Sequence, residues 1–214
     1  MRQPKAIRHH IPTFAFVVEG ETEVWYLQMF KQHEQRDRNL RVNIKPEIPQ
    51  KKKIRDQYKL VRELARSEYD RVFWIVDLDV IITETREAPK EKLPPLNEFM
   101  ELRRRLHDEF DNVQVIVNNP CLEFWFLLHF VKTNEYYKNY QEVLIELREY
   151  LRGYDKTRRY FMRTNKDIYA RLKPYLEHAI ENAGELGNFD EKNPLKALSE
   201  MDELFRIEAL QTVR

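Results

Sequence analysis

Phe14-Ala-Phe-Val-Val-Glu-Gly-Glu-Thr-Glu23 joins an apolar run to a group of acids. The apolar residues 14–18 are too few for a helix and show no polar alternation, so they predict a strand that is buried on both faces. Gly20 permits a tight turn after this strand, and a helical pattern begins at residue 21. Glu19 and Glu23 are therefore expected at the carboxyl end of a strand, where open α/β sheets bind ligands.

A second buried strand, at 71–77, also ends in acids. Its sequence, Arg71-Val-Phe-Trp-Ile-Val-Asp77, has an aromatic and β-branched centre without a polar break. Asp79 follows Asp77 after one residue, and in extended backbone the two side chains would project to the same side. We expect the two strands to bring their carboxylates to one edge of a sheet.

The rest of the N-terminal half alternates between strand and helix patterns. These patterns predict a helix at 21–36, a short or edge strand at 41–48 that contains Pro46, an amphipathic helix at 53–68, a loop at 83–95, a helix at 96–110 and a strand at 113–117. Asn118-Asn-Pro120 is expected to end the last strand. The alternation predicts an α/β fold with a mainly parallel sheet of about four strands, flanked by helices.

The C-terminal half is predicted to be helical. Residues 122–130 are apolar almost all round, which predicts a buried helix with Glu123 and His129 as its polar exceptions. Further helices are predicted at 139–152, 165–182 and 194–208, the last of them capped by Asn193 and Pro194. The sequence has no repeat or flexible linker, so a single domain at 1–214 is expected, with an α/β core at 12–120 and a helical extension at 121–214 packed on it.

The composition is that of a folded protein from a reducing compartment. Hydrophobic residues make up 42% of the chain, enough for a core, and the single cysteine, Cys121, excludes an internal disulfide framework and a zinc site with several cysteines. No run of 18 apolar residues is present, and residues 1–10 are basic without a signal-peptide core. We therefore expect a cytoplasmic protein without a membrane partner.

The net charge of +1 does not by itself indicate a nucleic-acid-binding protein. Three local basic runs, at 51–55, 103–105 and 156–159, could contact phosphates. The simpler interpretation of each run is a solvated face of a helix. The charge pattern therefore leaves both interpretations open.

The acids at the two strand ends predict a metal site. Glu19, Asp77 and Asp79, with Glu23 as a fourth candidate, would present oxygen ligands at one sheet edge. Mg²⁺ and Mn²⁺ prefer such carboxylate and water ligands. Without a cation among them, crowded carboxylates would raise one another's pKa values by repulsion.

Three motifs together resemble a known family. A buried strand ending in Glu-Gly-x-Thr-Glu and a later one ending in Asp-x-Asp are similar to the Toprim domain of bacterial primases, type IA topoisomerases and OLD-type nucleases. Asn119-Pro-Cys-Leu-Glu-Phe-Trp-Phe-Leu-Leu-His-Phe130 resembles the Asn-Pro-x-x-Glu-x-Trp-x-x-x-His-Phe signature of the RloB-like family, which is found around restriction-modification and abortive-infection loci. Tyr154-Asp-Lys156 and Asn193-Pro194 lie where later motifs of that family fall, so the resemblance spans about residues 12–208.

The resemblance implies a Toprim-like fold and a Mg²⁺- or Mn²⁺-dependent nuclease acting on DNA or RNA in antiphage defence or restriction. Glu19, Asp77 and Asp79 match the metal-binding positions, and Glu23 matches the second glutamate of the nuclease-like branch. The alternatives are a non-catalytic module that binds nucleic acid or a nucleotide, a partner subunit of a defence complex, and nucleotidyl transfer as in primases. Nucleic acid is the expected partner, and a defence-system protein and a second copy of the chain are further candidates.

Each acid of the site has a simpler structural interpretation. Glu19 could be a surface acid facing a helix dipole, and Glu23 could complete a cap in the first helical turn. Asp77 and Asp79 could form an Asx turn, although their pairing with Glu19 favours metal binding. Glu84 is expected to be solvated in a loop.

The remaining candidates lie in the C-terminal half. Glu123 follows Asn118 and Asn119, so it could act on substrate or hold the loops of the site, and Glu23 or Glu123 could orient the attacking water or serve as general base. His129 does not share a helix face with Glu123 and is expected to be a core histidine. Cys121 is expected to be structural, because no cation lies beside it in the sequence. Lys156 could offset charge on a scissile phosphate, or it could be a solvated lysine.

Overall fold

Strand β1 (Thr13–Val17) lies inside a single sheet of order β2-β1-β3-β4-β5. The computed structural model describes residues 12–38, 41–45, 53–89 and 93–207. Strands β2 (Arg41–Lys45), β3 (Arg71–Asp77) and β4 (Val113–Asn119) run parallel to β1, and the short β5 (Leu198–Ser199) is antiparallel to β4. The predicted α/β fold with a mainly parallel sheet is confirmed. The predicted edge strand is also confirmed as β2, although Pro46 and residues 47–48 lie outside the described residues.

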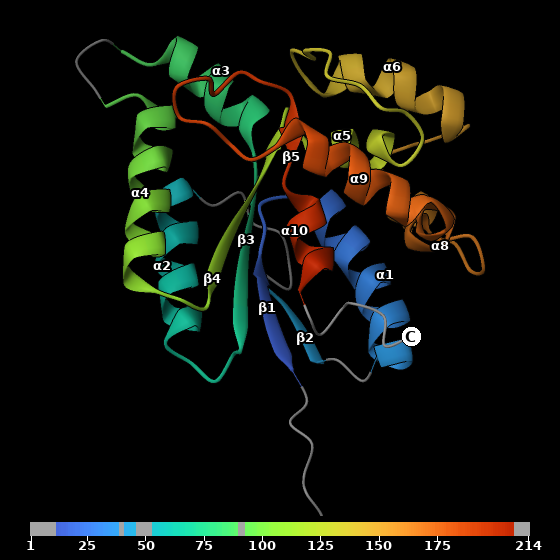
Figure 1. The fold of residues 1–214 in the computed structure, drawn as a ribbon, viewed down its shortest axis with the longest axis horizontal. Coiled ribbons are helices and arrows are strands. Elements are labelled where there is room, and N and C mark those ends of the chain that lie inside the picture. The colour runs from blue at the N-terminus through green and yellow to red at the C-terminus, as the bar shows by residue number, and fades with distance from the viewer. Residues whose placement is uncertain (1–11, 39–40, 46–52, 90–92, 208–214) are drawn as a thin grey trace, which may run out of the picture.

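Helices cover both faces of this sheet (Figure 1). On one face lie α2 (Ile54–Ala65) and α4 (Pro95–Glu109), and on the other lie α1 (Glu21–Arg38) and α10 (Met201–Arg206). The remaining described helices are α3 (Leu78–Glu87), α5 (Leu122–Leu128), α6 (Tyr140–Tyr150), α7 (Arg158–Phe161), α8 (Ile168–Leu172), the 3-10 turn η1 (Lys173–Tyr175) and α9 (Leu176–Leu186).

The sheet order creates a topological switch point between β1 and β3. The chain leaves β1 through α1 towards β2 on one side, and it returns through α2 to β3 on the other side of β1. Because the two connections diverge on opposite faces, the carboxyl ends of β1 and β3 border an open crevice, the usual ligand site of such sheets. The acids that follow these two strands therefore meet at that crevice.

The core explains why the two central strands carry no polar residue between their ends. Phe14, Phe16 and Phe73 are buried from both sides, and the rings of Phe16 and Phe73 stack at 5.0 Å between centroids across β1 and β3. Every residue of α5 is buried, as its sequence predicts, because the helix contacts α6, α9, β4 and β5. The Trp125 indole donates to the Tyr26 hydroxyl at 3.1 Å, which satisfies its N–H inside the core.

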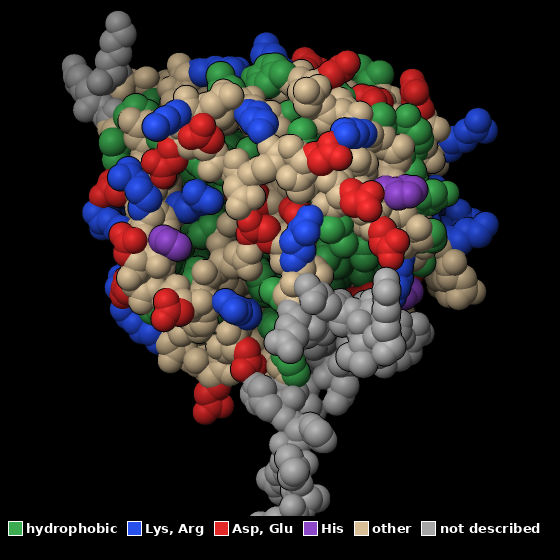
Figure 2. Space-filling view, in the orientation of Figure 1, with side chains coloured by type: hydrophobic (Ala, Val, Ile, Leu, Met, Phe, Trp, Pro, Cys, Tyr) green, Lys and Arg blue, Asp and Glu red, His purple; other side chains and the backbone are tan. Residues whose placement is uncertain are grey.

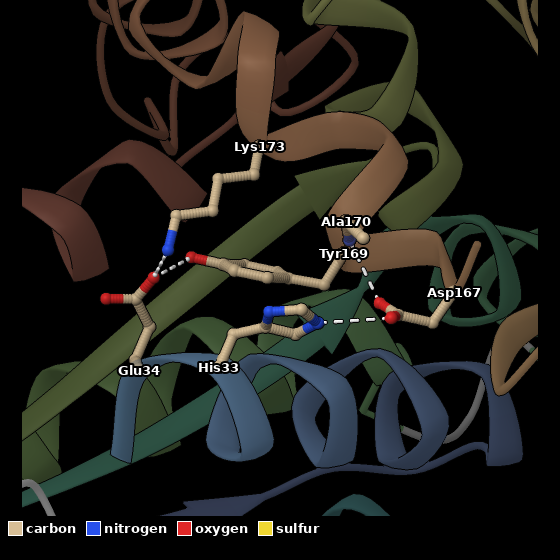
Figure 3. A network of polar contacts seen from close by, with 6 residues as sticks. All are labelled: His33, Glu34, Asp167, Tyr169, Ala170 and Lys173. Carbon is tan, nitrogen blue, oxygen red and sulfur yellow. Dashed lines mark hydrogen bonds and ion pairs between the residues drawn. The ribbon is translucent and has the colours of Figure 1, made fainter. Parts of the chain in front are cut away.

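A buried polar network joins the helical C-terminal half to α1 (Figure 3). Glu34 is 2% exposed and accepts from the Tyr169 hydroxyl and from the Lys173 ammonium, each at 2.8 Å. One residue earlier in α1, His33 Nε2 lies 3.1 Å from an Asp167 carboxylate oxygen, and the other oxygen of Asp167 accepts from the Ala170 backbone N–H. These contacts hold α8 and η1 on α1. They thereby also fix the C-terminal end of the segment 151–167, which connects α6 to α8.

The prediction of a loop at 83–95 was wrong for its first part, because α3 follows β3 directly and continues to Glu87. Leu78, Ile81 and Ile82 have helical spacing and pack into the core, and the proline-rich part of the segment lies beyond the helix. The prediction that Asp77 and Asp79 share an extended segment was therefore also wrong. Asp77 ends a strand, whereas Asp79 lies in the first turn of a helix.

Two helix predictions in the C-terminal half were wrong in detail. The helix predicted at 165–182 is divided into α8, η1 and α9, since Pro174 lacks the N–H that would continue α8. Within the helix predicted at 194–208, residues 198–199 instead form β5, and α10 begins only at Met201. Pro194 does not start a helix; its carbonyl accepts from the Asn119 side chain at 3.2 Å.

None of the helices in the described ranges has the length and apolar character needed to span a bilayer. Figure 2 shows acidic and basic side chains interspersed over the described surface on this face of the molecule. This mixture agrees with the net charge of +1.

Candidate functional site

A cavity of about 290 Å³ opens at the switch point between β1 and β3. The acids Glu19, Glu23, Asp77 and Asp79 all line it, as predicted from the two strand ends. The cavity is lined in addition by Gly20, Thr22, Ile75, Val80, Cys121 and Lys156. Four carboxylates and one ammonium group thus face a space large enough for a phosphate with its bound waters.

Asp77 is held by two neighbouring segments. It lies opposite Asn118 in the β3–β4 register, and the Asn118 side-chain N–H donates to Asp77 Oδ1 at 3.1 Å. The Leu122 backbone N–H donates to Asp77 Oδ2 at 3.1 Å, and the Ser199 hydroxyl donates to Asn118 Oδ1 at 2.7 Å. The carboxylate of Asp77 is therefore oriented from β4, β5 and the start of α5.

Asp79 enters the cavity from a different direction. Its backbone N–H donates to the Pro120 carbonyl at 3.1 Å, and its Oδ1 accepts from the Val80 N–H at 2.7 Å. The side chain is partly exposed, whereas Leu78 before it is buried. The first turn of α3 thus presents one carboxylate to the cavity next to Asp77.

Glu23 and Gly20 form a close contact at the start of α1. Glu23 is 8% exposed, and a Cβ atom at residue 20 would lie 2.5 Å from Glu23 Oε2. A side chain at this position would therefore displace the Glu23 carboxylate. Glu19 precedes the turn and is partly exposed, and it lines both this cavity and a neighbouring one of about 200 Å³.

Glu123 and Lys156 form an ion pair at the far wall. Glu123 is fully buried, and its Oε1 accepts from the Lys156 ammonium at 3.0 Å and from the Tyr154 hydroxyl at 2.8 Å. The Lys156 Nζ also lies 3.8 Å from the centre of the Tyr140 ring, a cation–π contact. The sequence analysis placed both residues among the candidates for one site, but it did not predict the ion pair between them.

The carboxylates raise one another's pKa values. Burial raises the pKa of Glu23 to about 7, and the charge of Glu123 adds to this rise, while hydrogen bonding with the Asp77 carboxyl lowers it in part. Burial and then the charges of Glu23, Asp79 and Glu123 raise the pKa of Asp77 well above its usual range. Burial also raises the pKa of Asp79. Without a cation, protonation therefore removes part of the negative charge of this cluster.

Lys156 is held in its charged form. Burial lowers the pKa of Lys156, but the charge of Glu123 and the hydrogen bond to it outweigh burial, and the pKa is raised overall. Tyr154 donates to Glu123, and the Tyr140 ring contacts Lys156. Neither tyrosine was proposed as a site residue from the sequence. Tyr154 stands in the Tyr-Asp-Lys motif, which was the available signal; Tyr140 had none.

The donor set of the cavity suits a hard divalent cation. Four carboxylates line it, and Glu23 Oε2 in the cavity and Glu123 Oε2 behind Lys156 are buried without a hydrogen-bond partner in the described structure. Within the described ranges, however, no three His, Cys, Asp or Glu side chains are grouped closely enough to form a ready set of metal ligands. The residues thus fit Mg²⁺ or Mn²⁺ with several water ligands, since Mg²⁺ is usually bound by one or two carboxylates and waters.

Of the other predicted residues, Cys121 lines the cavity, and His129, Glu84 and Asn119 are not among its lining residues. His129 is 1% exposed and its Nδ1 lies 2.9 Å from the Trp125 carbonyl oxygen, so it is the predicted core histidine. Cys121 is buried, and burial raises the pKa of its thiol well above the usual range, in agreement with a structural role. Glu84 is exposed and lines only the neighbouring cavity, and the Asn119 side chain donates to the carbonyls of Pro194 and Lys196.

His129 makes the folded protein sensitive to acid. Burial lowers the pKa of His129 from 6.5 to about 4, so its neutral form is favoured in the folded state. The unfolded chain then binds more protons between these two values, and stability present above 6.5 is lost as the pH falls towards 4. We expect His129→Asn to remove about 2 kcal/mol of the stability loss that the wild type shows between about pH 7 and pH 5.

Urea unfolding at the two pH values measures this difference. His107→Asn is the matched control, because His107 is exposed on α4. The assignment of His129 as a neutral core group is wrong if both variants lose the same free energy of unfolding on acidification as the wild type.

The fold and the site define an α/β protein with an acidic cavity at the switch point of a mainly parallel sheet. Residues 14–208 match the family model described as RloB-like protein, so the chain belongs to the RloB-like family. This match confirms the resemblance of the sequence motifs. No curated protein and no solved structure gives a significant match to the chain.

Proposed function

We propose that this chain is a Mg²⁺- or Mn²⁺-dependent nuclease that hydrolyses phosphodiester bonds of DNA or RNA in antiphage defence or restriction. The observation that carries the proposal is the convergence of Glu19, Glu23, Asp77 and Asp79 on one cavity that also contains Lys156. Membership of the RloB-like family agrees with it. Carboxylates alone would repel a phosphodiester, so an acidic cavity favours phosphate chemistry only together with a cation.

The acidic residues of the cavity would bind the metal ion. Glu19, Asp77 and Asp79, with Glu23, would hold the ion, which when bound lowers the pKa of a water and offsets charge on the phosphate oxygens. Asn118 and the Leu122 N–H keep the Asp77 carboxylate oriented towards the cavity. This orientation is fixed before substrate binds, as electrostatic catalysis requires.

Lys156 would contact the scissile phosphate. Its ammonium lines the cavity while Glu123 and the Tyr140 ring fix it from behind, so its charge is already in position when negative charge develops in the transition state. Glu123 Oε1 is occupied by Tyr154 and Lys156. Glu23 Oε2, which has no hydrogen-bond partner in the described structure, is therefore the better proton acceptor of the two glutamates.

A cleavage assay tests the proposal. Single- and double-stranded DNA and RNA are incubated with the protein and Mg²⁺, Mn²⁺ or a chelator, and Glu19→Ala and Asp77→Ala are compared with the wild type. We expect metal-dependent cleavage that both substitutions abolish and that Asp108→Ala, which changes an exposed acid on α4, leaves intact. Cleavage that survives both Glu19→Ala and Asp77→Ala would refute the site.

A non-catalytic function is the second candidate. The observation in its favour is that the described acids are not grouped as a ready set of metal ligands. A module or partner subunit that binds nucleic acid or a nucleotide in this cavity needs no such set. Tight binding of the wild type to an oligonucleotide in chelator, with no cleavage of any substrate in either metal, would establish this function instead.

A further inference from the structure

The described basic residues differ in whether an acid lies beside them. Most arginines on the sheet-covering helices and the lysine after α5 are neutralised by acids close to them. The pairs are Arg55 with Glu98, Arg62 and Arg66 with Glu109, Arg103 with Glu200, Arg104 with Glu191, Arg105 with Glu101, and Lys132 with Glu185. The basic run at 103–105, which could have contacted phosphates, is therefore internally paired.

A second group, Arg158, Arg159, Arg163 and Lys166, is different, and we refer to it as the basic strip. All four side chains are exposed, and none has an acidic partner among the described residues. Residues 152–166 contain six Lys and Arg and a single acid, Asp155, which gives the segment a local charge of +5. The whole chain carries only +1, so this segment is far more basic than the chain as a whole.

Local structure fixes the basic strip with its charges outwards. Phe161 is fully buried, and its ring lies 5.7 Å from that of Trp25 on α1 and 6.1 Å from that of Phe126 on α5. This anchor turns Arg158 and Arg159 of α7 towards solvent. The following turn is closed by a hydrogen bond from the Lys166 N–H to the Arg163 carbonyl at 3.0 Å.

The basic strip begins at the wall of the acidic cavity. Lys156 lines the cavity, and Arg158 starts α7 two residues later. Thr157 lies between them and caps α7, accepting from the Tyr160 N–H at 3.3 Å. Positive charge therefore continues from the cavity onto the surface without an intervening flexible segment in the described chain.

We propose that the basic strip is the surface that binds the phosphate backbone of the nucleic-acid strand whose scissile bond enters the cavity. This inference rests on the proposed function and adds the binding surface for its substrate. An unpaired cation gains more from a phosphate than one already neutralised by an acid, because the latter must first give up its partner. None of the exposed large hydrophobic side chains of the described surface lies at 152–166. The centre of a protein–protein interface is usually apolar, so this segment fits a nucleic acid better than a protein partner.

The salt dependence of binding tests the basic strip. Fluorescence anisotropy measures the Kd of a short labelled oligonucleotide, single- or double-stranded DNA or RNA, for the full chain in chelator at several salt concentrations. Arg158→Gln/Arg159→Gln and Arg163→Gln/Lys166→Gln should each weaken single-strand binding about 10-fold near physiological salt and make the slope of log K against log salt shallower by about 1.4. In the cleavage assay both variants should raise KM and leave kcat within about twofold, because they bind substrate in ground state and transition state alike.

Arg104→Gln/Arg105→Gln is the matched control. It removes the same charge from α4, on the opposite face of the sheet from α1, where both arginines are paired with acids (Figure 1). Equal slopes for the control and the two strip variants would overturn the inference, even if the wild type cleaves nucleic acid. Salt-dependent binding that only the strip variants weaken, without cleavage, would support the strip and refute the nuclease. Absence of binding to every probe would refute the strip, and absence of cleavage in either metal as well would refute both.

Discussion

Glu23→Gln is expected to reduce metal-dependent cleavage on the order of 10³-fold and, in the same protein, to raise the free energy of unfolding of the metal-free state by about 1 kcal/mol. Glu23 is buried beside Asp77 and faces the charge of Glu123. Glutamine keeps the size of the side chain, removes one negative charge from the cluster, and can donate to the Asp77 carboxylate. Opposite effects on activity and stability are typical of a site that concentrates like charges for function.

Thermal unfolding with and without Mg²⁺ measures the stability effect, which should appear as a rise in Tm of about 3 °C in chelator. The added stability that Mg²⁺ gives the wild type should shrink in the variant, because the ion loses a carboxylate. Glu21→Gln is the matched control, since Glu21 is exposed two residues earlier on α1. A Glu23→Gln protein that is less stable in chelator and still cleaves would show that Glu23 is a structural acid.

The sequence alone could predict the sheet and one edge of the site. Residues 14–18 and 72–76 are apolar without interruption, and runs of this length favour a strand covered on both faces. Parallel strands share their carboxyl edge, so Glu19 and Asp77 could be placed together without knowledge of the packing. The error at Asp79 has a local cause: α3 begins immediately after β3, and no turn residue marks the change from extended to helical backbone.

Features that depend on distant contacts could not be predicted. Strand β5 consists of two residues whose pairing with Asn118 and Asn119 determines it, and its own sequence carries no strand signal. Packing likewise determines which basic residues have acidic partners. The arginines at 103–105 and Lys156 are paired with acids, whereas Arg158 and Arg159 have no acidic partner among the described residues. Charge patterns in a sequence therefore predict surfaces less well than apolar patterns predict strands.

Lys156→Met is expected to lower the free energy of unfolding by about 2–3 kcal/mol. Glu123 is fully buried, and without Lys156 its carboxylate keeps Tyr154 as its described partner. Removing one partner of a buried ion pair is strongly destabilising, because the remaining charge is then buried without compensation. The expected loss is below the full range for buried pairs because the Lys156 side chain is 37% exposed. Urea unfolding measures it, and Lys132→Met, which breaks the exposed pair with Glu185, should cost less than about 1 kcal/mol.

The double variant Lys156→Met/Glu123→Gln separates the structural role of the pair from its catalytic role. Glutamine retains an oxygen that accepts from the Tyr154 hydroxyl, so removing both charges should restore most of the stability that Lys156→Met loses. Cleavage should stay as low as in Lys156→Met, because the cation facing the phosphate is still absent. A double variant that recovers activity together with stability would show that Lys156 serves only to neutralise Glu123. One that remains as unstable as Lys156→Met would show that the two residues are not energetically coupled.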